Sequence, residues 1–158
     1  MLSSIEDINL AHKYCQDDPV RPHIPCSWRI EDNRIMYAMY EDQYAEYAEP
    51  LIKTPLAILC VAFTNEVPTS EEDLMRFAEV DNPSIAVFYT VWSYHQGAGR
   101  QIINDVQNRI HKDSNGQIMR YVTLSPLTRI AERFHIRNGA TKLAVHETCQ
   151  NFEYPQPK

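Results

Sequence analysis

Half of the glycines in this chain stand in one short loop, which reads SYHQGAGR over residues 93–100. The 158 residues include four glycines, and two of them are Gly97 and Gly99. A buried strand is predicted before the loop and a helix from Arg100, so the free N–H groups of the first helical turn would point into it. Small residues let a phosphate or pyrophosphate approach those N–H groups, and Arg100 would add a charge-assisted contact. A tight strand-to-helix turn that binds nothing is the alternative.

Two side chains further along the chain are candidates for proton chemistry. His135 could protonate a leaving thiolate or a carbanion near neutral pH, because an imidazole titrates close to that range. Its alternative role is structural, as a helix residue hydrogen-bonded to a carbonyl. Ser125 could donate a hydrogen bond to a thioester or carboxylate oxygen. Because Ser125 precedes Pro126 at a predicted helix start, it could instead be an ordinary helix cap.

The proline-stiffened stretch VRPHIP offers a candidate wall for an acceptor site. Arg21 and His23 are its polar residues, and loops on a rigid scaffold carry much binding chemistry. A plain surface location is the alternative for both. Asp17 and Asp18, just before them, are expected to be solvated turn residues. The histidines and cysteines show no spacing typical of a metal site, so no metal is expected.

The elements that would position these residues form a single mixed α/β (α+β) domain over residues 1–158. Apolar periodicity and cap chemistry predict helices over 3–15, 69–80, 100–113 and 125–140, with caps at Ser3 or Ser4, at Thr69 or Ser70, and at Ser125. β-Branched and apolar runs predict strands over 34–40, 55–68, 84–94, 117–124 and 141–154, with a tyrosine-rich hairpin loop over 41–50.

Composition narrows the function classes. The formal net charge of −6 disfavours a nucleic-acid binder that works by neutralising phosphates. No stretch approaches the apolar length that a membrane span needs, and the acidic, amphipathic opening MLSSIEDINLAHKYC predicts no secretory leader. Four cysteines without paired spacing predict free thiols. We therefore expect a reduced cytoplasmic protein that uses small molecules.

The stretch SIAVFYTVWSYHQGAGRQIINDVQNRI resembles motif A of the GNAT superfamily of N-acetyltransferases, a strand, a glycine loop and a helix that hold the pyrophosphate of coenzyme A. Gly97 and Gly99 match its glycines, and Tyr94 stands where the family usually has Gln or Arg. The resemblance implies a twisted, mostly antiparallel sheet flanked by helices, which opens between the strands 84–94 and 117–124. It also implies a coenzyme A site formed by Tyr94, Gln96, Gly97, Ala98, Gly99 and Arg100.

The next stretch, YVTLSPLTRIAERFHIRNGA, resembles the following GNAT motif, in which a tyrosine often protonates the CoA thiolate. His135 falls on that position, and Thr128 replaces the usual Asn. Four segments, PLAILCVAFTNEVPTS, AVFYTVWS, TLSP and RFHIRNGA, also resemble the malonyl-CoA decarboxylase catalytic domain, which has the same fold. That resemblance implies Ser125 and His135 as catalytic residues, here predicted on one helix.

The expected function is transfer of an acyl group, most simply acetyl from acetyl-CoA, to an amine on a small molecule or peptide. A malonyl-CoA decarboxylase-like lyase is the alternative, favoured by the lack of a carboxylate on the 84–94 strand. A non-catalytic CoA-binding or interaction module is the third. We expect the protein to bind no metal, nucleic acid or membrane, and a homodimer is possible.

Overall fold

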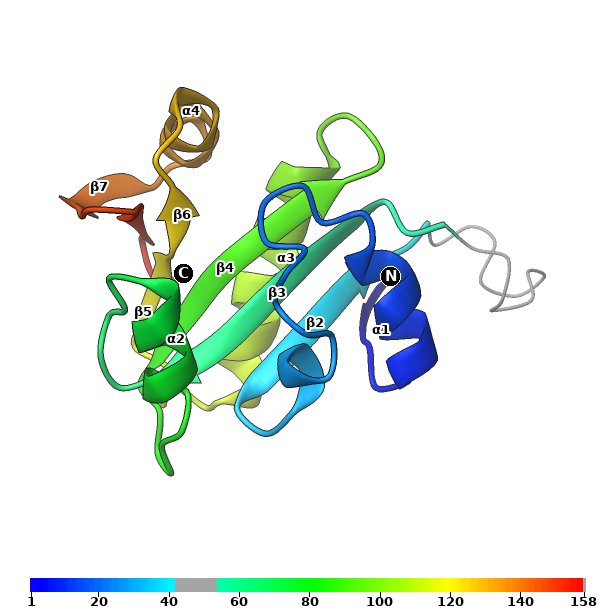
Figure 1. Cartoon of the computed structure of the whole chain (residues 1–158), viewed down its shortest axis with the longest axis horizontal. Helices are drawn as coiled ribbons and strands as arrows, with labels where there is room; N and C mark the ends of the chain where they lie inside the picture. Colours follow the sequence, from blue (N-terminus) through cyan, green and yellow to red (C-terminus); the bar gives the residue numbers. More distant parts are fainter. Residues whose placement is uncertain (42–53, 158) are drawn as a thin grey trace.

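The computed structural model describes residues 1–41 and 54–157. These residues form one mixed, mostly antiparallel sheet with helices on both faces (Figure 1). The elements are β1 (Leu2–Ser4), α1 (Ile8–Cys15), η1 (Trp28–Ile30), β2 (Arg34–Met39), β3 (Ala57–Thr64), α2 (Glu71–Phe77), β4 (Ile85–Ser93), α3 (Ala98–Asp113), β5 (Arg120–Thr123), β6 (Ser125–Pro126), α4 (Arg129–Arg137), β7 (Thr141–Val145) and β8 (Cys149–Tyr154). The predicted fold class and the opened sheet are confirmed.

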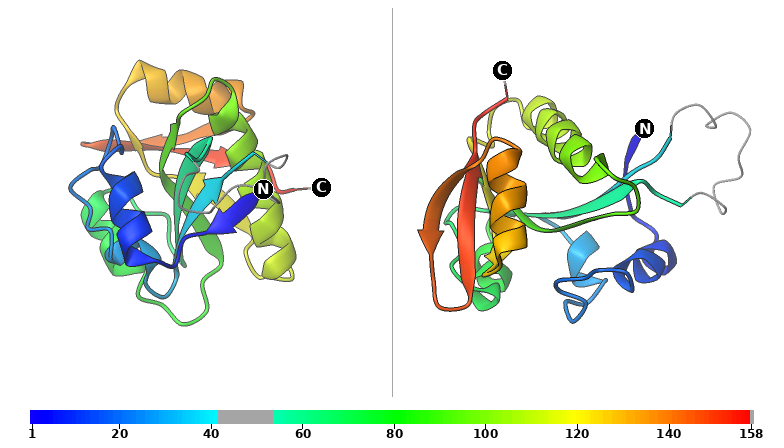
Figure 2. Two further views of the ribbon diagram at one scale, coloured as in Figure 1. Left: turned by 90° about the vertical axis from the view of Figure 1, so that its right-hand side faces the viewer. Right: turned by 90° about the horizontal axis from the view of Figure 1, so that it is seen from above.

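The strand order is β1-β2-β3-β4-β5-β8-β6, with β7 paired to the other side of β8. Seen from above, α3 covers one face, while α1, η1 and α2 cover the other (Figure 2). Two apolar clusters fill the two interfaces. One packs Ile102, Val106 and Ile110 of α3 against the sheet, and the other packs Ala11 and Leu74 of α1 and α2. Such burial on both faces explains why β3 and β4 read as nearly continuous apolar runs.

Strands β4 and β5 are the parallel pair recorded in this sheet, and they stay together over four residues only. Their register runs from Ile85↔Arg120 to Phe88↔Thr123, whereas β4 continues to Ser93. A last backbone bond joins the Leu124 N–H to the Phe88 carbonyl, at 3.1 Å. Beyond it the chain of β5 turns away to pair β6 with β8. The far half of β4 therefore loses its neighbour on this side.

A bulge bends β4 at the point where it separates from β5. Cys60 pairs with Thr90 and Val61 with Phe88, so Tyr89 is the extra residue on β4. A bulge of this kind kinks its strand and increases the local twist. The bulge and the departure of β5 together open the sheet next to Tyr89.

Three predicted boundaries are wrong, each because strand pairing overrides local sequence signals. Residues 3 and 4 were expected at the start of the first helix but pair with β2 as part of β1, so Asp7 rather than Ser3 or Ser4 caps α1. Ser125 was expected to cap the fourth helix, yet it pairs with Gln150, and Thr128 is the cap. The single strand over 141–154 is the hairpin of β7 and β8. The Ser70 cap of α2 is confirmed, and residues 42–50 of the expected hairpin loop lie outside the described residues.

Asp18, expected in solvent, is instead completely buried against Arg29. The Arg29 Nη1 donates to Asp18 Oδ2 at 2.8 Å, and neither side chain has exposed surface. Asp18 Oδ1 accepts hydrogen bonds from the Val20 and Arg21 N–H groups and from the Thr90 hydroxyl. The prediction failed because the partner lies eleven residues away, beyond the reach of a local turn pattern. The ion pair ties the proline-rich segment to the middle of β4.

Replacing Asp18 with Asn should lower the free energy of unfolding by about 3 kcal/mol, because Arg29 would keep a buried charge without its partner. Urea denaturation of the purified variant measures this loss. Asp17→Asn is the matched control, since Asp17 is exposed and should cost less than about 1 kcal/mol. Equal losses in the two variants would contradict the central place given to the Asp18–Arg29 pair.

Candidate functional site

The opening between β4 and β6 contains a cavity of about 280 Å³. Its walls come from the segment Pro19–Arg21, from β4, from the start of α3, from Leu124–Pro126 and from α4. Pro19–Arg21 belongs to the face of the sheet that carries α1, whereas Gly99 and Ile103 belong to the face that carries α3. The cavity, called the cleft below, thus passes through the sheet from one face to the other.

The glycine loop is placed at the α3 side of the cleft. Gly97 has φ = 82° and caps α3, a left-handed conformation that a glycine adopts without strain. Gly99 lines the cleft, and a Cβ there would lie 3.2 Å from the ring of Phe134. The Ala98 N–H donates a hydrogen bond to the His95 carbonyl, at 3.2 Å. Among the described residues no acceptor is recorded for the N–H groups of Gly99 and Arg100.

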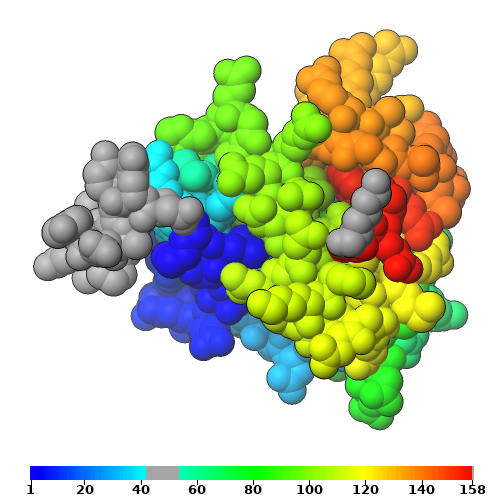
Figure 3. Space-filling model, turned by 180° about the vertical axis from the view of Figure 1, so that it is seen from behind, coloured from blue at the N-terminus to red at the C-terminus, as the bar shows by residue number. Residues whose placement is uncertain are grey.

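A second hollow adjoins the glycine loop where α3 faces the ends of α4 and β8. Gly97, Arg100, Gln101, Asn104, Asn138 and Tyr154 are among its lining residues, and its volume is about 420 Å³. The view from behind shows α3, in yellow-green, lying across this face with the red C-terminal strand β8 beside it (Figure 3). Amide and guanidinium groups therefore surround the N-terminus of α3, where the helix dipole favours an anion.

Of the residues expected in the coenzyme A site, only Gly99 is among the described residues that line the cleft; Gly97 and Arg100 line the second hollow, and three others line neither space. The Tyr94 hydroxyl donates to Asp17 Oδ2 at 2.7 Å and accepts from the Trp92 indole at 3.1 Å. These bonds hold the ring on the α1 face of the sheet, opposite α3. Gln96 is exposed, and Ala98 packs into the apolar cluster beneath α3. A contribution of Gln96 and Ala98 to an anion site would thus come from their backbone.

His135 lies in the wall of the cleft on α4 and is buried. Its ring stacks on Phe152 at 5.3 Å between centroids and meets Phe134 edge-on at 5.1 Å. The Nδ1 atom is 2.8 Å from the Tyr154 hydroxyl. Burial among these aromatic rings lowers the pKa of His135 from 6.5 to about 4, because a charged imidazole would lose its hydration. The imidazole is therefore neutral at pH 7.

The hydrogen bond from Tyr154 bears on which ring nitrogen carries the proton. Burial raises the pKa of the Tyr154 phenol, so the hydroxyl keeps its proton at neutral pH. When that hydroxyl donates to Nδ1, the imidazole proton sits on Nε2. Nε2 has no recorded partner among the described residues, so it is free to donate to a bound molecule.

Ser125 faces the same cleft from β6 rather than from the start of α4. It is buried, and its Oγ lies 2.8 Å from the Thr123 Oγ1, which in turn accepts the Phe152 N–H at 3.1 Å. Thr123 therefore fixes the position of the Ser125 hydroxyl. With the cap role taken by Thr128, Ser125 is a polar group in a cavity wall, on a different element from His135.

The two site residues expected in the proline-rich segment lie in different surroundings. Arg21 is buried and lines the cleft. The His23 side chain is 60% exposed, lies outside the cleft and contacts Glu71 Oε2 at 2.7 Å. No group of three or more metal-ligating side chains is found in the described part of the chain.

Sequence reasoning missed three residues that shape the site. Tyr154 positions His135, Thr123 positions Ser125, and Phe134 fills the space above Gly99. The alternation in NFEY placed Phe152 and Tyr154 on one face of a strand, but their contact with His135 depended on the β7–β8 hairpin, which was not predicted. The Thr-x-Ser spacing in TLS was visible and is the signal for the Thr123–Ser125 pair, since alternate residues of an extended chain share a side.

Acidification should destabilise this protein through His135. The unfolded histidine binds a proton near pH 6.5 and the native one near pH 4, so the unfolded state takes up more protons between these values. Stability is then fully present above pH 6.5 and falls as the pH drops toward 4, by about 2 kcal/mol between pH 7 and pH 5. Urea denaturation at both pH values measures the slope. His135→Gln should remove most of it, and an unchanged slope in that variant would contradict the assignment.

Comparison with known proteins reveals similarity in structure only. No family sequence profile matches the chain, and no curated protein matches it in sequence. Malonyl-CoA decarboxylase from Agrobacterium vitis superposes with a TM-score of 0.62 at 22% identity, over 85% of this chain and 35% of that one. The enzyme from Rhodopseudomonas palustris gives 0.59 at 23%, over 80% and 33%. This chain thus spans about a third of the length of those decarboxylases.

Other neighbours match over nearly their whole length. The AtaTR complex bound with acetyl-CoA superposes with a TM-score of 0.61 at 13% identity, over 98% of this chain and 92% of that one. The KacTA–DNA complex gives 0.59 at 15%, over 98% and 92%. No helix among the described residues has the length and apolar character to cross a bilayer. Identities this low establish the fold alone, and that fold is the one shared by GNAT acetyltransferases and malonyl-CoA decarboxylases.

Proposed function

We propose that this chain is an acyl-CoA-dependent acyltransferase, which holds the thioester in the cleft and transfers its acyl group to an amine. The observation that carries the proposal is the cleft itself. It passes through the sheet from the N-terminus of α3 to Arg21, with His135 in its wall. The likeness to an acetyl-CoA complex over nearly the full length of both chains supports this choice.

Coenzyme A fits the residues at the α3 end of the cleft. The N–H groups of Gly99 and Arg100 have no recorded acceptor among the described residues, and pyrophosphate oxygens would supply one. Gly97, where an added Cβ would meet nothing within 4 Å, leaves room for the phosphates, while the Arg100 guanidinium adds a positive charge. The apolar wall of Ile103 and Phe134 would hold the thiol arm. The thioester supplies an activated acyl group, and the other steps belong to the protein.

His135 would act as the proton donor. Its imidazole is neutral at pH 7, and the Tyr154 hydroxyl can keep the proton on Nε2. Acyl transfer breaks the carbon–sulfur bond, and the sulfur leaves with the electron pair. Nε2 would give its proton to this sulfur while the imidazole takes up the proton released by the amine, so the free thiol forms and the ring is neutral before and after the step. The proton given up by the amine can return to the imidazole through water.

Decarboxylation of a β-carboxyacyl-CoA is the second candidate, favoured by the groups that line the cleft. Ser125 and His135 both lie there, and no Asp or Glu is among the described lining residues to deprotonate an amine. In this reaction the bond to the carboxylate breaks, CO₂ leaves, and the electron pair stays on the α-carbon. The Ser125 hydroxyl would stabilise charge on the thioester oxygen, and His135 would protonate the α-carbon.

Coenzyme A binding can be tested at Gly97. A Cβ there meets nothing within 4 Å, but φ = 82° is unfavourable for a β-branched residue. Gly97→Val should distort the loop and weaken CoA binding by at least about ten-fold, as measured by calorimetry. Gly116→Val is the matched control, since Gly116 has a similar φ of 81° at the other end of α3. Equal affinities in the wild type and the Gly97 variant would place the anion site elsewhere.

The products distinguish the two reactions. A transferase should release thiol from acetyl-CoA only when an amine is present, whereas a decarboxylase should convert malonyl-CoA to acetyl-CoA without releasing thiol. His135→Ala should slow either reaction by roughly 10²- to 10⁴-fold. Ser125→Ala should damage the decarboxylase strongly and the transferase little. Mass spectrometry of the CoA products, run on the wild type and on the His135 and Ser125 variants, measures both reactions.

Unimpaired turnover by the His135 variant would contradict the proton-donor role. Binding of CoA without turnover of either substrate would instead indicate the non-catalytic module.

A further inference from the structure

Arg21 places a buried cation in the wall of a mostly apolar cavity. Its side chain is 3% exposed, and at neutral pH it is the sole formally charged group among the described residues that line the cleft. The other lining residues are apolar or neutral, including Ser125, Thr90 and the uncharged His135. A cation in such surroundings is poorly solvated and is costly unless an anion or several acceptors meet it.

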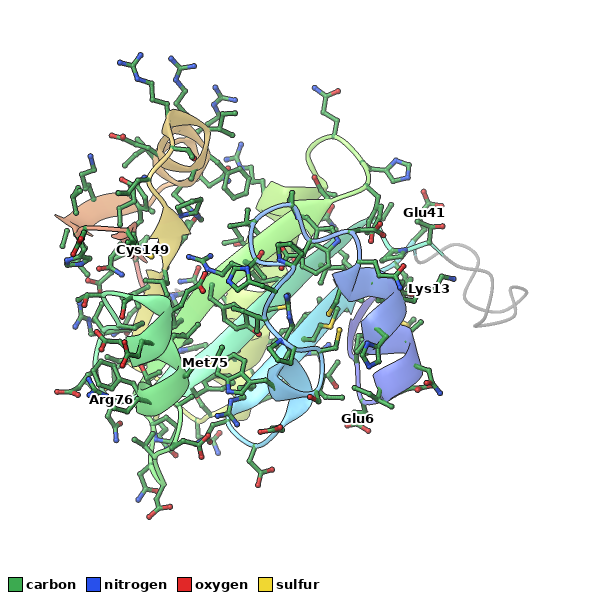
Figure 4. All side chains as sticks on the ribbon, in the orientation of Figure 1. Glu6, Lys13, Glu41, Met75, Arg76 and Cys149 are labelled. Carbon is green, nitrogen blue, oxygen red and sulfur yellow. The ribbon has the colours of Figure 1, made fainter. Side chains whose placement is uncertain are left out.

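The recorded partners leave this guanidinium incompletely satisfied. A guanidinium has five N–H groups. The Nε donates to Glu71 Oε1 at 2.9 Å, and Nη1 donates to the Tyr89 carbonyl at the β4 bulge. The Nη2 reaches only the Cys149 thiol, at 3.9 Å, and a thiol is a weak acceptor. Cys149 lies on β8, between α4 and α2 in Figure 4.

The nearby acids are already engaged. Asp18 is fully occupied by Arg29, Thr90 and two backbone N–H groups. Glu71 is shared between Arg21 and His23 and is 36% exposed, so water screens much of its charge. Neither carboxylate is among the lining residues of the cleft. The side of Arg21 that meets the cleft therefore lacks an anion.

The Arg21 guanidinium is not needed to hold the proline-rich segment in place. The Arg21 N–H donates to Asp18 Oδ1 at 3.0 Å, and the Arg21 carbonyl accepts from Arg29 Nη2 at 2.6 Å. Backbone atoms thus hold residue 21 in place, and these bonds would survive a change of side chain. The side-chain bonds to Glu71 and to the Tyr89 carbonyl fix the guanidinium before a ligand arrives, which lowers the cost of binding that ligand.

We propose that Arg21 binds a carboxylate of the substrate at the end of the cleft opposite Gly99. This inference rests on the proposed function, because it assumes a CoA thioester that enters from the α3 side. The carboxylate would then belong either to the far end of the acyl group or to the acceptor amine. A planar guanidinium suits a carboxylate, since the two can form paired, charge-assisted hydrogen bonds.

The first experiment compares CoA, acetyl-CoA, malonyl-CoA and succinyl-CoA by calorimetry. If the acyl group carries the carboxylate, malonyl-CoA or succinyl-CoA should bind the wild type about 10- to 100-fold more tightly than acetyl-CoA. Arg21→Gln should bring this ratio close to one while leaving the affinity for CoA itself unchanged. His23→Ala is the matched control, since His23 also contacts Glu71 but lies outside the cleft, and it should keep the ratio.

The second experiment tests the acceptor as the source. With acetyl-CoA, thiol release is measured with a panel of amino acids and with their carboxamides. A preference for the free carboxylates of about 10-fold or more, lost in Arg21→Gln and kept in His23→Ala, would assign the carboxylate to the acceptor. Arg21→Lys keeps the charge without the planar fork and should show an intermediate preference in whichever arm is positive.

The wild-type preference is decisive even if the Arg21 variants fold poorly. If CoA binds but the wild type favours a carboxylate in neither arm, the inference is overturned and the proposed function stands. If CoA and its thioesters do not bind at all, both fail together.

Discussion

The separation of β5 from β4 after Phe88 and Thr123 is the constraint on which the site depends. A sheet normally satisfies its backbone groups by continued pairing, but here the bulge at Tyr89 bends β4 while β6 and β8 draw the following chain away. The result is a gap in the sheet, lined by residues from both of its faces. Four of the residues considered for chemistry line that gap: Gly99 at one end, Arg21 at the other, and Ser125 and His135 on the far wall.

A buried ion pair supports the wall that holds Arg21. Asp18 and Arg29 fasten a segment with little regular structure to the centre of β4 through Thr90. Ion pairs of this kind contribute little net stability compared with apolar packing, but they are specific, because each partner is costly without the other. Here the ion pair positions the segment, and the Arg21 backbone, whose N–H donates to Asp18 and whose carbonyl accepts from Arg29, is held with it.

The sequence predicted those features that depend on neighbours in the chain. The strand, glycine loop and helix over 84–113 follow from local periodicity, and the predicted opening of the sheet came from the resemblance that this stretch carries. Features set by distant partners were missed. Ser125 was read as a cap because Gln150, its strand partner, gives no local signal, and the two-strand nature of 141–154 was hidden by a continuous β-like composition. The burial of Asp18 failed for the same reason, whereas the neutral state of His135 required knowledge of Phe152 and Tyr154.

The contact between Gly99 and Phe134 links the two helices that border the cleft. A Cβ on residue 99 would lie 3.2 Å from the Phe134 ring, so that ring would have to shift by a few tenths of an ångström to make room for it. Gly99 in this sense sets the spacing between the two helices at the border of the cleft. A larger residue at position 99 would push the Phe134 ring, and with it the neighbouring His135, away from the otherwise unchanged glycine loop. A substitution at this one position would therefore affect turnover more than ligand affinity.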